Sequence, residues 1–173
     1  MAKRERHRVP RGGLTDAVIR KIDQRKDGTQ QGLVLNVPSL TVNNLGNDKA
    51  AKIALAATTK LDQGLTTASN GVLAAKINGS FDIALDAALK PKTVKGQTTI
   101  DVTEAGGAFG QAAGLGAVLN ADLTPTSLND VSLRLSQAGK NLGGLIVSGP
   151  FDPEKMEGKL NVAIAQIDRQ VLR

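Results

Sequence analysis

Hydrophobic and polar residues alternate along most of this chain, from Gly32 to the C-terminal region. An alternation with a period of two places every second side chain on the same face of a β-strand. The alternating runs cover residues 33–37, 40–42, 51–61, 65–77, 81–89, 98–102, 117–123, 131–135, 145–147 and 160–164. We therefore predict an all-β fold, an antiparallel meander of about eight or nine strands with one apolar face.

The first turn in the middle of the chain is expected at Asp62-Gln63-Gly64. These residues have the chemistry of a three-residue hairpin loop with glycine in the left-handed position. Such a loop pairs Leu61 with Leu65, so that both strands present their apolar residues to one face.

A second turn is expected at Asn78-Gly79-Ser80. A two-residue loop would place Lys76 on the apolar face, whereas a three-residue loop pairs Ile77 with Phe81 and keeps that face apolar. We therefore predict the three-residue loop, followed by a strand that continues to Pro91. The same three residues form a glycosylation sequon, but Asn-Gly is also a common turn dipeptide, and the turn interpretation is favoured.

The sequence predicts no helical layer that would cover the apolar face. The one internal segment with helical potential, residues 105–119, contains glycine at positions 106, 107, 110, 114 and 116. Each interior glycine costs a helix about 1 kcal/mol relative to alanine, so this helix would be marginal. These glycines also lack the spacing of a phosphate-binding loop. Either the sheet closes onto itself as a sandwich or barrel, or something outside this chain occupies its concave side.

The N-terminal region breaks the alternation and carries the net charge. Residues 1–26 hold nine Lys or Arg against three Asp or Glu, which accounts for the whole formal net charge of +6. We predict a basic disordered tail over residues 1–13. A short helix or linker is expected over residues 14–31, because four aliphatic residues have helical spacing. These residues are Leu14, Val18, Ile19 and Ile22. The β-segment is expected to fill residues 32–173.

The composition excludes several kinds of functional site. The chain of 173 residues has no Cys, which excludes thiolate nucleophiles and thiolate metal sites. Its single His is His7, so a catalytic triad or a His-cluster metal site would have to use this one residue. Asp82 and Asp86 would lie ~13 Å apart along a strand, too far for a glycosidase pair. No apolar run approaches the ~18 residues of a transmembrane helix. We predict a protein that is not an enzyme and that holds no metal and no cofactor.

Four segments of the chain together resemble the AsmA-like family, relatives of the TamB translocation and assembly module. They are GVLAAKINGSFDIALDAAL, KGQTTIDVTEAGGAFG, NDVSLRLSQ and NLGGLIVSGPFDPEKMEGKLNVAIAQIDRQVLR. The resemblance covers roughly residues 32–173, and it rests on long alternating strands and Asn-Gly turns rather than on one strict motif.

The resemblance implies a long antiparallel sheet curled into a groove, taco or partly open barrel, with at most a short N-terminal helix. It implies a fragment of a larger chain that is anchored in the inner membrane and lies in the periplasm, with a role in phospholipid transport and outer-membrane assembly. Acyl chains would then occupy the face that no helix covers. The residues expected to line this groove are Ile53, Leu55, Leu73, Ile77, Phe81, Ile83, Leu85, Val102, Leu133, Leu135, Val147, Val162 and Ile164.

Two other functions are compatible with the sequence. The abundance of Ala, Gly, Thr and Asn is compatible with a structural or adhesive β-repeat protein, a β-solenoid or fibre, although no fixed period of 20–30 residues is present. The basic N-terminal arm is compatible with nucleic-acid binding. The body of the chain is neutral and almost without aromatic residues, so we expect no nucleic acid as a partner.

Overall fold

A computed structural model describes residues 8–24, 26, 30–63, 71–152 and 155–165. The strands are β1 (Arg8–Gln24), β2 (Gln30–Gly46), β3 (Ala50–Gln63), β4 (Gly71–Leu85), β5 (Pro91–Gly107), β6 (Leu115–Thr124), β7 (Ser127–Gln137), β8 (Lys140–Asp152), β9 (Glu157–Gly158) and β10 (Asn161–Ala165). A single turn of 3-10 helix, η1 (Gly110–Ala112), connects β5 to β6.

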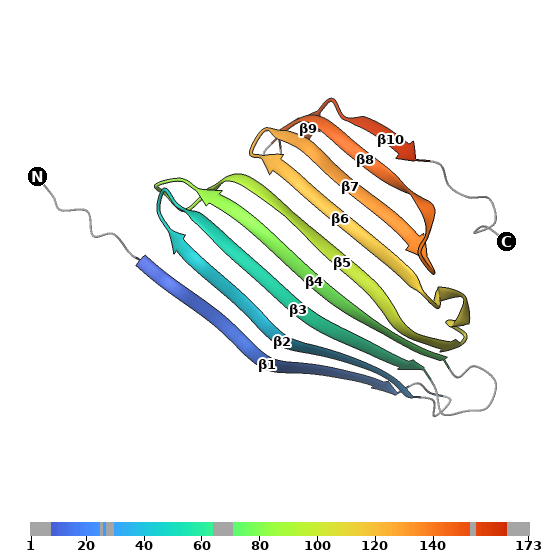
Figure 1. Ribbon diagram of the computed structural model, residues 1–173. Helices are drawn as coiled ribbons and strands as arrows, with labels where there is room; N and C mark the ends of the chain where they lie inside the picture. The colour runs from blue at the N-terminus through green and yellow to red at the C-terminus, as the bar shows by residue number, and fades with distance from the viewer. Residues whose placement is uncertain (1–7, 25, 27–29, 64–70, 153–154, 166–173) are drawn as a thin grey trace, which may run out of the picture.

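The strands form one antiparallel sheet in the order β1-β2-β3-β4-β5-β6-β7-β8-β10, and β9 pairs with the end of β8 (Figure 1). β1 and β10 are the two edges, so the sheet is open and not closed into a barrel. The prediction of an all-β meander is confirmed. A single-layer sheet without stacked coils is not the architecture of a β-solenoid.

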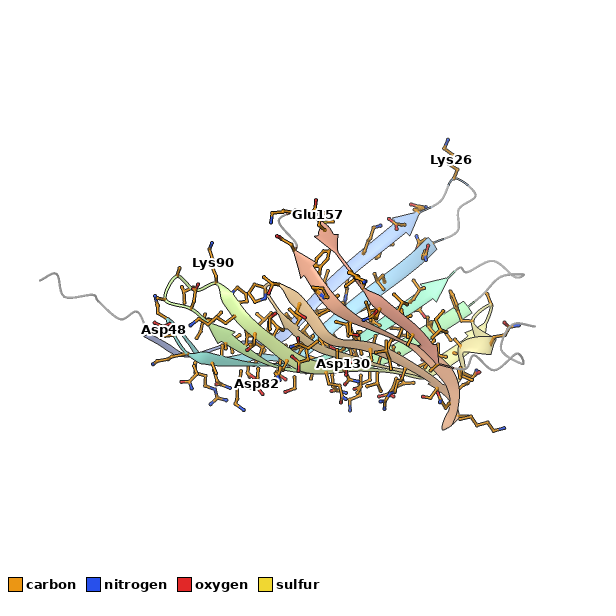
Figure 2. The ribbon with its side chains drawn as sticks, turned by 90° about the horizontal axis from the view of Figure 1, so that it is seen from above. Lys26, Asp48, Asp82, Lys90, Asp130 and Glu157 are labelled. Carbon is orange, nitrogen blue, oxygen red and sulfur yellow. The ribbon has the colours of Figure 1, made fainter. Side chains whose placement is uncertain are left out.

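The open sheet is twisted and curled. Register shifts interrupt the pairing at several places, among them 36–39 on β2 and 128–131 on β7. An extra residue in one strand of a pair bends that strand and increases the local twist. Figure 2 shows Asp82 and Asp130 on the underside of the sheet, whereas its ends near Lys26 and Glu157 rise on the opposite side. The face opposite Asp82 is therefore the inner side of the curl.

The predicted turn at Asn78-Gly79-Ser80 is wrong, because these residues lie inside the continuous strand β4. Ile77 pairs with Ala57 of β3 and with Ile100 of β5 rather than with Phe81. Two neighbouring strands satisfy the backbone here, and this pairing outweighs the local turn preference of Asn-Gly.

The pairing predicted for Leu61 is also wrong, because Leu61 pairs with Leu73. The strand β3 continues to Gln63, through two of the three residues expected to form the loop. Gly64 and Leu65 lie outside the described residues.

The strand predicted to run on to Pro91 ends at Leu85. Asp86 closes a turn there, since its Oδ1 accepts hydrogen bonds from the backbone N–H of Ala88 and of Lys90, each at 2.8 Å. The hydrogen bond from Lys90 is the main cause that holds the pKa of Asp86 below its ordinary value. The bond from Ala88 and the charges of Lys92 and Lys90 also lower this pKa, and desolvation partly opposes them.

The helix or linker predicted over residues 14–31 is wrong, because residues 8–24 form β1 and β2 begins at Gln30. The predicted disordered tail overlaps β1 over residues 8–13, and its first seven residues lie outside the described part. β1 is an edge strand with aliphatic side chains on both faces, so its sequence lacks the simple alternation of a half-buried strand. Asp16 adds a break in the alternation, with a positive φ of 54° in the middle of the strand.

Few side chains are fully buried in this single layer. The buried hydrophobic residues are Ala51, Ala57, Ala75 and Leu85, and Ser132 is the buried polar residue among those described. The three alanines lie on the same face of β3 and β4, where larger side chains of the neighbouring strands cover them. The sheet is therefore held together by backbone pairing and by side-chain contacts along each face, without a two-layer core.

Candidate functional site

The inner face of the sheet is lined by aliphatic side chains from one edge to the other. In an antiparallel pair, directly opposed residues point to the same face, so the register identifies which residues share it. One row crosses all nine strands of the main path through Leu14, Leu40, Leu55, Gly79, Thr98, Leu119, Leu133, Leu145 and Ile164. A parallel row runs through Val42, Ile53, Phe81, Gly96, Ala121, Val131, Val147 and Val162.

The register places all thirteen residues of the predicted lining on this one face. The residues come from β3, β4, β5, β7, β8 and β10, and they occupy the two rows above and the rows on either side. Leu85 is buried, ten of the others are partly exposed, and Val162 and Ile164 at the edge are 60% and 68% exposed. The odd-numbered positions of β3 and β4 share a face whether residues 78–80 turn or continue, so the error in register did not alter the face.

Several exposed residues of the same face were absent from the predicted lining. Ile100, Leu119 and Leu145 are 39%, 42% and 37% exposed and lie in the centre of the rows. The period of two contained the signal, because Ile100 and Leu145 lie two residues from the included Val102 and Val147, and Leu119 belongs to the alternating run 117–123. Leu14 and Ile19 on β1 also lie on this face, but the helical interpretation of their segment concealed them.

One aromatic ring lies flat in the middle of the inner face. A Cβ atom built on Gly96 would collide with the ring of Phe81, and a Cβ on Gly79 would lie 3.2 Å from the same ring. Phe81 therefore covers the two glycines of the neighbouring positions instead of standing upright on the sheet. This arrangement fills the area that the missing side chains leave and keeps the surface level.

The outer face is largely polar, and in the row through Lys52 and Asp82 the charges alternate in sign from β3 to β6. Lys52 on β3 pairs with Asp82 on β4 at 3.2 Å, and Lys95 on β5 pairs with Asp122 on β6 at 2.9 Å. Asp82 and Lys95 are themselves opposed in the register, so four charges form one row. Opposite charges on facing positions stabilise a sheet, and exposed pairs of this kind contribute at most about 1 kcal/mol each.

Hydrogen bonds connect the same face across β5, β6 and β7. Gln97 Nε2 donates to Asn120 Oδ1 at 2.8 Å, and Asn120 Nδ2 donates to the buried Ser132 Oγ at 3.2 Å. Asp122 accepts a bond from Asn129 Nδ2 at 3.0 Å. The Lys95 ammonium and then this amide hold the pKa of Asp122 below its ordinary value. The sheet is thus amphipathic, with one charged face and one aliphatic face.

The described sheet does not bring together the two carboxyl groups that the sequence offered as a candidate pair. Asp82 is paired with Lys52 on the outer face, and Asp86 lies in the turn after β4, so these two carboxyl groups do not form a pair. No three potential metal ligands of the His, Cys, Asp or Glu types cluster within the described residues. In that same part of the chain, no helix has the length and apolar character needed to cross a membrane.

Comparisons with protein-family models, with curated proteins and with solved structures found no match to this chain.

Proposed function

We propose that this chain is a non-enzymatic segment of a bacterial envelope protein that holds or conducts the acyl chains of phospholipids on its inner face. The observation that supports the proposal is the largely aliphatic surface, which crosses nine strands and is covered by no second layer in the described residues. Water contact with such a surface is unfavourable by about 25 cal/mol per Å², and hydrocarbon chains would remove that contact.

The chemistry of the face suits hydrocarbon better than a folded protein partner. Most of its side chains are Leu, Ile, Val and Ala, with the ring of Phe81 and the hydroxyl of Thr98 near the middle. Protein interfaces draw much of their affinity from Trp, Tyr and Arg anchors, and the face has none of these among its described residues. A largely aliphatic surface with few directional groups binds acyl chains at many similar positions, which would let a lipid slide along it.

The charged outer face also supports the proposal, because it stays solvated. Its charged rows, such as Lys52–Asp82 and Lys95–Asp122, keep it in contact with water. A lipid-carrying sheet needs this asymmetry, because one face has to remain solvated while the other shields hydrocarbon.

The resemblance to the AsmA-like family adds context to the proposal. Long antiparallel strands in a curled, open sheet are what that resemblance led us to expect. We extend the proposal accordingly to a periplasmic location, an inner-membrane anchor in a larger chain, and a role in outer-membrane assembly.

The proposal is tested by lipid extraction and native mass spectrometry of the chain purified from bacteria. Leu119→Glu places a carboxylate on the inner face, and Ile146→Glu places one on the outer face. The two residues form a matched pair, because each is 42% exposed and lies inside a strand. Far-UV circular dichroism is used to check that both variants retain the sheet.

We expect phospholipid to co-purify with the wild-type chain and with the Ile146→Glu variant, but not with the Leu119→Glu variant. Full burial of a Leu side chain contributes about 1.5–3 kcal/mol, so the exposed fraction of Leu119 contributes roughly 1 kcal/mol on contact with lipid. A carboxylate beneath hydrocarbon adds a larger penalty, so binding should weaken more than ~10-fold. A wild-type chain without lipid, or equal lipid in the two variants, would contradict the proposal.

A further inference from the structure

β1 ends the sheet with a long edge that has no partner strand among the described residues. Its 17 residues present aliphatic side chains on both faces. Leu14 and Ile19 on the inner face are 49% and 61% exposed, and Val18 and Ile22 on the outer face are 51% and 70% exposed. Val18 and Ile22 lie on the face opposite the proposed lipid surface, so lipid binding does not explain their exposure. A long, hydrophobic edge strand is a template for pairing with another strand.

The directions of the two edge strands decide which strand of a second copy could pair with β1. Eight antiparallel steps separate β1 from β10, so the two edge strands run in the same direction. Joining β10 of one copy to β1 of the next would give a parallel pair limited by the five residues of β10. Joining β1 to β1 about a two-fold axis gives an antiparallel pair that uses most of a 17-residue strand.

We propose that β1 pairs with β1 of a second copy in a two-fold symmetric dimer, with Val18 opposite its own counterpart. This register keeps inner face next to inner face and places Ile19 opposite Ala17. It also brings Arg20 of each copy opposite Thr15 and Asp16 of the other, where opposite charges stabilise the pair.

The remaining pairs of this register contain no like charges. Going outward from Arg20, they are Lys21 with Leu14, Ile22 with Gly13, Asp23 with Gly12, and Gln24 with Arg11. The glycines leave room for the larger residues opposite them. Centring the pair on Arg20 or Lys21 would instead place identical charges face to face. Centring the pair on Ala17 or Ile19 brings no opposite charges together. Charge complementarity therefore favours Val18 as the centre.

The dimer accounts for the exposed residues of β1 on both faces. A second β1 would flank Val18 and Ile22 on the outer face as well as Leu14 and Ile19 on the inner face. The two inner faces would join into one continuous surface, since the register preserves the side to which each residue points.

The test is the mass of the full chain in solution, measured by size-exclusion chromatography with multi-angle light scattering at micromolar concentrations. We expect twice the chain mass of 18.0 kDa for the wild type. Arg20→Glu turns two attractive pairs into two repulsive ones and should weaken dimerisation about 30-fold. Arg11→Glu is the matched control, because it makes the same charge change on the same face opposite the uncharged Gln24.

Charge exchange is the decisive variant. The double substitution Asp16→Lys with Arg20→Glu restores opposite charges and should restore the dimer. Asp16 has a positive φ of 54°, which Lys tolerates less well, so circular dichroism has to confirm the fold. Asp16→Asn keeps a side chain suited to that conformation, removes the charge, and should weaken the dimer less than Arg20→Glu does.

Three results would overturn the proposal. One is a wild-type chain that remains monomeric, and another is an Arg20→Glu variant that dimerises as strongly as the Arg11→Glu control. The third is a dimer that Leu119→Glu dissociates and Arg20→Glu does not, because that dimer would form through the inner faces.

Discussion

Adding one methyl group at Gly96 should destabilise the sheet because Phe81 occupies the space. A Cβ atom at position 96 would meet the Phe81 ring, with 2.7 Å to its Cγ, and would lie 2.5 Å from the Ser80 carbonyl oxygen. The ring would have to leave its position and the backbone would have to shift. Overpacking of this kind costs about 1–3 kcal/mol.

Gly32→Ala is the matched control, because a Cβ at position 32 of β2 meets nothing within 4 Å. Replacing an unstrained glycine stabilises a protein by about 0.4–1 kcal/mol, through the lower entropy of the unfolded chain. Gly96→Ala and Gly32→Ala should therefore differ by roughly 2–3 kcal/mol in the free energy of unfolding, with opposite signs relative to the wild type.

The measurement is urea unfolding followed by far-UV circular dichroism, since the chain has no Trp or Tyr to report by fluorescence. A loss of 2 kcal/mol corresponds to about 4–8 °C in Tm for a chain of this size. Phe81→Ala in the Gly96→Ala background should recover part of the loss, because it removes the ring but leaves the Ser80 carbonyl in place. If Gly96→Ala is as stable as Gly32→Ala, the ring does not lie over Gly96 and the reasoning fails.

Three further predictions concern the turn after β4, the outer face and the N-terminal segment. Leu89 has a positive φ of 65° and is 49% exposed, so Leu89→Gly should raise the free energy of unfolding by about 1 kcal/mol in urea titrations, and an unchanged midpoint would show that this conformation is not strained. The pKa of Asp122 is lowered in the folded state by Lys95, so its stabilising contribution is complete above the ordinary Asp pKa and is lost as the pH falls through the folded-state value. Asp122→Asn should therefore flatten the fall in unfolding midpoint between about pH 5 and pH 2, and an unaltered slope would contradict the assignment. Deletion of residues 1–7 removes none of the described strand pairs and should preserve the circular-dichroism spectrum, and a loss of the β-sheet signal would contradict this expectation.

The sequence was most informative where one face of a strand is apolar and the other is charged. Along β3, Ile53 and Leu55 alternate with Lys52 and the other residues of the outer face, so the period of two could be read directly. Such a pattern predicts the face of each residue, and through it the candidate lining, independently of which strands pair.

Pairing and edge strands could not be predicted in the same way. Asn78 and Gly79 have a strong local preference for turns, and only the neighbouring strands on both sides show why they remain extended. In β1, Val18 and Ile19 are adjacent apolar residues on opposite faces, so the spacing resembles a helix. Both errors arise because the interaction that decides the structure lies far away in the sequence.

The single-layer meander affects where unfolding begins and how the number of strands can change. From β1 to β8, each strand is hydrogen-bonded to its immediate neighbours in the order of the chain, so the architecture is nearly one-dimensional. Stability in such an array is approximately a sum over adjacent pairs, and fraying should begin at β10, whose five residues are all exposed. Duplication or loss of a whole hairpin would change the width of the array without disturbing distant strands. The width of the inner face can therefore be adjusted by evolution in steps of two strands.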